Sequence, residues 1–110
     1  MSNKQDEVAK RTTAAKAAIQ KAIDDEESVG LFVSHHLSEL KPAYWKKRTG
    51  TPKPTPQQVV DLLELRSHWG EDGDGGLDRF DFTLLGDVTD YVLSVSFNKK
   101  GRVEGVELES

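Results

Sequence analysis

The sequence contains no cysteine, and this absence removes several classes of protein at once. Disulfide cross-links, thiolate nucleophiles and cysteine-ligated zinc sites are all excluded. No apolar run approaches the roughly 20 residues that a membrane-spanning helix requires. Residues 1–11 also lack the apolar core of a secretory signal peptide. These absences predict a cytoplasmic protein that does not enter a membrane.

The sequence also lacks an excess of positive charge, because 15 basic and 19 acidic residues give a formal net charge of −4. Nucleic-acid binding is therefore disfavoured, since it normally requires a basic excess. The charge is unevenly spread: residues 41–53 hold five bases and no acid, whereas residues 71–90 hold seven acids and one base. Such asymmetry steers a charged partner, unless the two blocks are ordinary surface or face each other in the fold.

The first part of the chain is expected to be helical. A length of 110 residues fits one domain, 1–110, which can bury a core without a metal or disulfide. Residues 8–27 are rich in helix formers with a narrow stripe of small apolar residues, which predicts a helix whose start, residues 1–10, frays. Apolar residues from Val29 to Tyr44 predict a second helix, with Ser28 as a cap and Pro42 near its end.

A proline-rich loop and a third helix follow. Prolines at positions 52, 54 and 56 exclude a regular helix over residues 48–56. Thr55, Pro56 and Gln58 have the spacing of a capping box with proline at the first helical position. This start signal predicts a short helix over residues 56–65.

After Leu65 the hydrophobic period changes to two, which indicates strands. Strands are expected over residues 66–69, 80–84, 91–97 and 102–109, with Gly101 closing a hairpin loop and Gly105 marking a bulge. Residues 84–90 are expected to connect the second and third strands. The predicted fold is α+β, with N-terminal helices packed on one face of an antiparallel meander of about four strands.

The stretch HWGEDGDGGLD, residues 68–78, has the composition of a calcium loop but not its spacing. Counted from Asp72 or from Asp74, the sequence fails to place oxygen ligands and glycine where an EF-hand requires them. Four glycines and the Asp-Gly pairs favour a strand-to-strand turn. We therefore expect a strongly negative connecting loop.

Three residues give the alternative of a metal site. His35 and His36 point about 100° apart on a helix and cannot chelate one ion as a pair. His35 and Glu39 share a helical face, and His68 could supply a third ligand, as in a metal-dependent enzyme or metal sensor. An amphipathic helix flank is the ordinary alternative for these histidines.

No pattern indicates nucleophilic catalysis, a phosphate loop or a dinucleotide site, so we predict no catalytic residue and no cofactor. Tyr44, Trp45 and Arg48 stand among the positive charges of residues 41–53, where aromatic and arginine side chains are typical of binding hot spots. The alternatives are that one aromatic belongs to the core, or that the segment stacks on a nucleic acid. The predicted partner-binding residues are Tyr44, Trp45, Arg48, Trp69, Asp72, Asp74 and Asp78.

Three stretches carry a family resemblance: FVSHHLSEL (32–40), TPQQVVDLLEL (55–65) and the run from Phe80 to Ser110. Together they resemble the bacterial domain-of-unknown-function family two-thousand-and-four over residues 30–110, with residues 28–110 as its core. The matching residues are His35, His36, Asp81, Phe82, Asp87, Thr89, Asp90, Tyr91, Glu109 and Ser110. The resemblance implies a small cytoplasmic bacterial protein and assigns no catalytic residue.

The main functional hypothesis is a non-enzymatic protein-binding module. Small acidic bacterial proteins of this kind include immunity proteins, which neutralise a toxin domain by presenting carboxylates to its basic active site. Asp72, Asp74 and Asp78 would present the charge, and Trp69 would anchor the partner. The alternative is the metal site at His35, Glu39 and His68.

Overall fold

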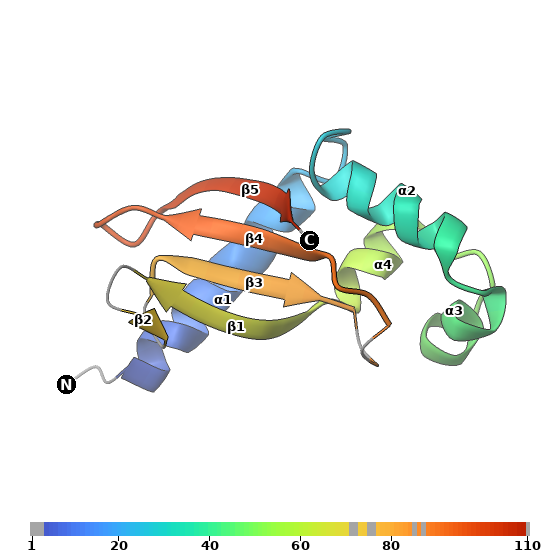
Figure 1. Cartoon of the computed structure of the whole chain (residues 1–110), viewed down its shortest axis with the longest axis horizontal. Coiled ribbons are helices and arrows are strands. Elements are labelled where there is room, and N and C mark those ends of the chain that lie inside the picture. The colour runs from blue at the N-terminus through green and yellow to red at the C-terminus, as the bar shows by residue number, and fades with distance from the viewer. Residues whose placement is uncertain (1–3, 71–72, 75–76, 85, 87, 110) are drawn as a thin grey trace.

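The structure is a computed structural model that describes residues 4–70, 73–74, 77–84, 86 and 88–109, with only the main chain described at Lys4, Gly73 and Asp74. Within these residues four helices precede five strands (Figure 1). The helices are α1 (Lys4–Lys21), α2 (Val29–Glu39), α3 (Pro42–Thr49) and α4 (Pro56–Asp61). The strands are β1 (Glu64–Gly70), β2 (Gly73–Asp74), β3 (Arg79–Thr83), β4 (Val92–Phe97) and β5 (Val103–Glu109).

The strands form one antiparallel sheet in the order β2-β1-β3-β4-β5. β1, β3, β4 and β5 lie side by side in this order and form a meander. β2 lies outside the meander, at the free edge of β1. The predicted α+β class is therefore confirmed. β2 is an addition that the sequence pattern did not predict, and its two residues pair with the outer side of β1 at Trp69 and Gly70.

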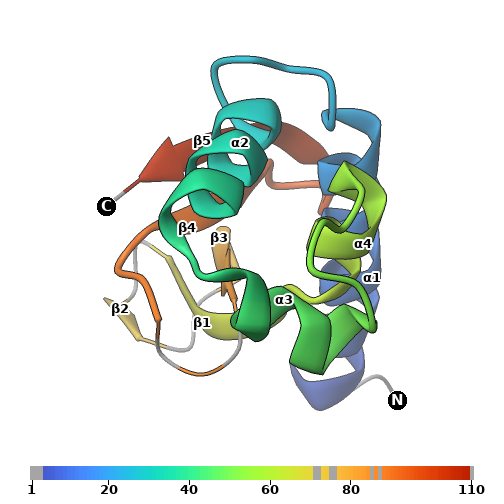
Figure 2. The same ribbon diagram turned by 90° about the vertical axis from the view of Figure 1, so that its right-hand side faces the viewer.

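One face of the sheet carries the core. The register places Phe80 opposite His68 and Val95, and Phe82 opposite Leu93, so these side chains share one face. α1 runs along this inner face, while α2, α3 and α4 gather toward one end of it (Figures 1 and 2). The buried cluster draws on all four helices and on β3 and β4; it includes Ile19, Phe32, Trp45, Val59, Phe80, Phe82, Leu93 and Val95.

The predicted boundaries of the first helix, residues 8–27, are wrong at both ends. α1 begins at Lys4, and Val8 packs against the core; fraying of residues 1–10 stays a prediction. The helix ends at Lys21, just before the acidic run at residues 24–27. Four carboxylates are unfavourable near the negative end of a helix dipole, which explains the early stop. No helix within the described residues is long and apolar enough to cross a bilayer.

The predicted second helix is two helices. α2 ends at Glu39, and Lys41 is extended, with φ −67° and ψ 149°. Proline disfavours helical geometry in the residue before it and lacks an N–H to continue the ladder, so Pro42 starts α3 rather than ending α2. Gly50, with φ 83°, ends α3. The loop expected over residues 48–56 is thus restricted to residues 50–55.

The capping box at Thr55 is confirmed, whereas the cap expected at Ser28 is not. The Gln58 N–H donates to the Thr55 hydroxyl (3.2 Å), and the Thr55 N–H donates to the Gln58 side-chain oxygen (2.8 Å). Ser28 stands at the N-cap of α2, but its hydroxyl donates to Asp25 Oδ2 (2.9 Å) and makes no cap bond. α4 ends at Asp61, four residues earlier than predicted, because the chain turns into β1 at Glu64.

The β4–β5 hairpin follows the prediction in detail. Gly101 has φ 80°, and the Asn98 N–H donates to the Arg102 carbonyl (2.9 Å). The register shifts between Ser96↔Gly105 and the next pair of β4 and β5, so Glu104 is the extra residue of a bulge next to Gly105. The strand predicted over residues 66–69 is longer and runs from Glu64 to Gly70.

Replacing Thr55 with alanine tests the start signal of α4. Thr55→Ala removes the acceptor for the Gln58 N–H, so we expect a loss of about 1 kcal/mol in the free energy of unfolding, measured by urea denaturation. The control is Thr13→Ala, the same change at an exposed position inside α1. Alanine is the better helix former there, so this variant should be unchanged or more stable by about 0.5 kcal/mol. Equal losses in both variants would contradict the role of the cap.

Candidate functional site

The face of the sheet opposite the core, which we call the outer face, carries polar side chains. Within the described residues no helix packs on it, and Figure 1 shows it facing the viewer with α1 behind. Alternation along the strands and the register between them define its members. They are Glu64, Ser67, Trp69, Arg79, Asp81, Thr83, Val92, Ser94, Ser96, Gly105, Glu107 and Glu109.

Cross-strand rows order this face. One row runs Trp69, Arg79, Ser96, Gly105 from β1 to β5, and the next runs Ser67, Asp81, Ser94, Glu107. Val92 and Glu109 belong to the third row. The first row therefore begins with a large aromatic ring and ends with a glycine, so the surface falls away from β1 toward β5.

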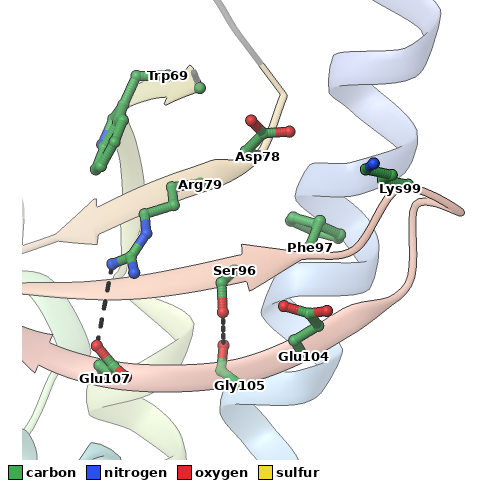
Figure 3. A pocket seen from close by; sticks show the side chains of 10 residues that line it. Trp69, Asp78, Arg79, Ser96, Phe97, Lys99, Glu104, Gly105 and Glu107 are labelled. Atoms are coloured by element: carbon green, nitrogen blue, oxygen red, sulfur yellow. Dashed lines mark hydrogen bonds and ion pairs between the residues drawn. The ribbon is translucent and has the colours of Figure 1, made fainter.

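A hollow of about 630 Å³ lies over that first row (Figure 3). Trp69 and Asp78 border it on one side and Glu104 and Glu107 on the other, and Arg79 reaches from β3 toward Glu107. Its floor is low because Gly105 has no side chain: a Cβ built there would meet only Ser96 Oγ within 4 Å, at 3.9 Å. We call this the Trp69 hollow.

A second hollow of about 470 Å³ adjoins the other rows and is lined by Arg66, Ser67, Asp81, Asp90, Val92 and Glu109. Together the two hollows are lined by six carboxylates and three cations. The carboxylates are Asp78, Asp81, Asp90, Glu104, Glu107 and Glu109; the cations are Arg66, Arg79 and Lys99. The outer face is therefore negative overall, which favours a positively charged partner.

Trp69 is the main apolar feature of the outer face. The residue is 39% exposed, one of three large hydrophobic residues left exposed among those that the structure describes. The indole N–H donates to Asp81 Oδ2 at 3.3 Å, and the Arg79 guanidinium lies 5.5 Å from the ring centre. An exposed tryptophan held in place by a carboxylate and a cation is a typical binding anchor.

Arg79 spans the sheet from β3 to β5. Its Nη1 lies 3.3 Å from Glu109 Oε1 and 3.9 Å from Glu107 Oε2. The side chain therefore crosses β4, whose Ser94 is only 2% exposed although it belongs to the outer face. Two buried acceptors there, Ser94 Oγ and Asp81 Oδ1, have no hydrogen-bond partner among the described residues.

The structure brings two of the predicted acidic-loop residues to this face and leaves the others unassigned. Trp69 and Asp78 both line the Trp69 hollow. Asp72 lies outside the described residues, and of Asp74 only the main chain is described, paired with Trp69 in β2. The acidic block of residues 71–90 also includes Asp81 on β3, which lies on the outer face beside Arg79.

The predicted contact residues of the basic segment do not form an open aromatic surface. Trp45 is 1% exposed and belongs to the core, so the expectation that it contacts a partner is not supported. Tyr44 is half-buried against the Trp45 ring, and the Arg48 guanidinium lies 4.1 Å from the Tyr44 ring centre. Burial raises the pKa of the Tyr44 phenol, and Arg48 opposes this shift. Arg48 therefore stacks within its own helix.

The three residues of the metal hypothesis do not come together. His35 packs on the Tyr91 ring (4.9 Å between centres) at the α2 end of the molecule. His68 stacks on Phe80 (5.1 Å) on the inner face beside α1. Glu39 is exposed at the end of α2. Within the described residues no group of three or more potential ligands could hold a metal ion.

His36 instead has a structural environment. Its Nδ1 lies 2.6 Å from the Phe32 carbonyl oxygen and its Nε2 lies 2.9 Å from Thr89 Oγ1. A carbonyl can only accept, so Nδ1 carries the proton and, in the neutral ring, Nε2 accepts from the Thr89 hydroxyl. Thr89 Oγ1 in turn accepts from the Tyr91 N–H (3.1 Å). The histidine thus fastens α2 to the segment before β4.

Several outer-face residues were not predicted from the sequence to bind a partner. Arg79, Ser94, Glu107 and Glu109 are polar positions of alternating strands, which are ordinary for a solvent-facing sheet. The period-two pattern shows that they share a face with Trp69 only when the register is known, and register depends on the bulges at β1 and β5. The period-two pattern was present in the sequence, but it identifies this face only when the pairing of the strands is known.

Comparisons with known proteins add no assignment. No family model matches this chain, and the comparisons with curated proteins and with solved structures found no match. The resemblance to family two-thousand-and-four therefore stays a prediction, although the structure places its His-His pair against its Thr89 and Tyr91.

The His36 environment makes stability depend on pH. Burial is the main cause that lowers the pKa of His36 from 6.5, and the Phe32 carbonyl opposes it. The unfolded chain then binds a proton more readily than the folded one, so stability is complete above about pH 6.5 and declines as the pH falls toward the folded pKa. We expect the urea midpoint to drop between pH 7.5 and pH 5.5 in the native sequence and to drop less in His36→Gln. His35→Gln, which keeps the buried ring, is the control. The same drop in His36→Gln as in the native protein would contradict this account.

Proposed function

We propose that this protein is a non-enzymatic protein-binding module that binds a basic protein through its outer face. The observation that carries the proposal is the uncovered sheet face with two hollows, bordered by six carboxylates and three cations, with Trp69 exposed at its edge. Antiparallel sheets commonly leave one face solvated. A hollowed, negative face with an exposed aromatic anchor goes beyond what solvation requires.

Charge and shape define the partner. The negative excess of the outer face accelerates the approach of a positively charged protein and disfavours acidic ones. Trp69 offers a large rigid contact area, and the low floor at Gly105 leaves room for a protruding side chain. The partner is thus expected to present a convex basic surface to the sheet.

The more specific form of the proposal is an immunity protein. Such a protein inactivates a toxin domain by covering its basic active site with carboxylates, and it works in the cytoplasm of the cell it protects. Trp69 and Asp78, both predicted from the sequence, line the same hollow and support this form. The toxin is then expected to be encoded beside this protein, which gives a defined candidate partner.

Two variants of the outer face test the proposal against that candidate, with affinity measured by calorimetry on purified proteins. Trp69→Ala removes the exposed anchor and should weaken binding by at least about thirtyfold. Gly105→Val fills the floor of the Trp69 hollow and should weaken it by about tenfold. The added Cβ lies at an ordinary contact distance, 3.9 Å from Ser96 Oγ, so the fold should be retained.

Leu31→Ala is the matched control, because Leu31 is an exposed apolar residue (45%) on α2, away from the outer face. Its affinity for the partner should equal that of the native protein. Thermal unfolding of all three variants checks that the fold is intact. Loss of binding in Leu31→Ala with full binding in Trp69→Ala would move the interface to α2 and refute the proposal.

A further inference from the structure

We propose that the partner inserts an arginine side chain above Ser94 on β4, in the place that Arg79 occupies in the free protein. In the free protein Arg79 then competes with the partner's arginine for the same carboxylates of the outer face. This inference rests on the proposed function and specifies which chemical group of the partner the face recognises.

The position of Arg79 follows from the register. Arg79 stands in the first row on β3 and Glu109 in the third row on β5, so the diagonal between them passes over β4 at the second row, which is Ser94. The ion pair of Arg79 Nη1 and Glu109 Oε1, 3.3 Å apart, lies along this diagonal. It accounts for the 2% exposure of a small polar residue on an uncovered face.

Arg79 leaves acceptors beneath it unused. Ser94 Oγ and Asp81 Oδ1 are buried and have no hydrogen-bond partner among the described residues. The other Asp81 oxygen, Oδ2, accepts from the Trp69 indole N–H at 3.3 Å. Buried acceptors without donors are costly, so a donor group that reaches both atoms gains stability that Arg79 does not provide.

The ion pairs of Arg79 can be exchanged at low cost. The side chains are 33% exposed for Arg79, 43% for Glu109 and 66% for Glu107. Ion pairs this open to solvent contribute little, because water screens them and the long side chains lose freedom on pairing. A cation from a partner that also excludes water makes the stronger interaction with the same carboxylates.

The geometry favours arginine over lysine. The available acceptors are spread over three strands: Asp81 on β3, Ser94 on β4, and Glu107 and Glu109 on β5. A guanidinium presents five donors in one plane and can serve several of them at once, whereas an ammonium is a compact point charge. The Trp69 ring, which Arg79 now approaches to 5.5 Å, offers a stacking surface for the incoming group.

The test measures binding of two defined probes, penta-arginine and penta-lysine peptides with blocked ends, by calorimetry at low salt. The native protein should bind penta-arginine several times more tightly than penta-lysine. Arg79→Gln removes the competitor and should tighten penta-arginine binding by about fivefold, the upper range of what an exposed ion pair is worth. Asp81→Asn removes the charge beside Ser94 and should weaken it by about tenfold.

Arg102→Gln is the matched control, since it removes the same charge from an exposed position outside both hollows. Its effect on penta-arginine binding should be less than twofold at 150 mM salt, whereas the effect of Arg79→Gln should persist. Equal tightening in the two variants would show a net-charge effect and overturn the inference. So would weaker binding in Arg79→Gln, or equal affinity for the two peptides.

The inference can fail while the proposed function stands. If the protein partner binds the native chain and loses affinity with Trp69→Ala, but binds Arg79→Gln and Arg102→Gln equally, the outer face is the interface and Arg79 is not a competitor. If the partner binds Trp69→Ala and Gly105→Val as tightly as the native chain, the proposed function itself fails. Thermal unfolding of each variant confirms that the fold is retained.

Discussion

The alternation of side chains along β1, β3, β4 and β5 decides which residues of the sheet enter the core and which face outward. It places Phe80, Phe82, Leu93 and Val95 on one face, where each is fully buried under the helices. The residues between them must then face the other way, whatever their chemistry. Because the four helices precede the sheet and pack toward the core face, no described helix covers the opposite face (Figure 1).

The outer face has three properties that are typical of a protein-binding surface. It has an excess of negative charge, and Trp69 is exposed on it. The Arg79 side chain also crosses β4, where Ser94 Oγ and Asp81 Oδ1 are buried and have no hydrogen-bond partner among the described residues. Ser94 Oγ and Asp81 Oδ1 are buried polar atoms of the kind that normally have a hydrogen-bond partner. The combination is better explained if a cationic partner completes these interactions.

The sequence predicted the fold class, the capping box at Thr55 and the bulge next to Gly105, because each has a local signal. It was wrong at Pro42, which starts a helix instead of ending one. For residues 41–53 it left open whether one aromatic belongs to the core, and the burial of Trp45 agrees with that alternative. Trp69 was predicted as a binding residue because it stands beside the acidic loop. Its neighbours Arg79, Ser94 and Glu109 were not, because only strand register brings them together.

The proposed function requires that the outer face, and not the helical end of the molecule, contacts the partner. The chain has two tryptophans, and each reports on one of these two regions. Trp69 lies on the outer face, and Trp45 lies in the core among the helices. Their indole N–H signals in a nitrogen-15 NMR titration with the basic partner give the most direct measurement, with Trp69→Phe to assign them. The account predicts that the Trp69 signal shifts to saturation while the Trp45 signal keeps its position. Saturated binding with an unmoved Trp69 signal would contradict it.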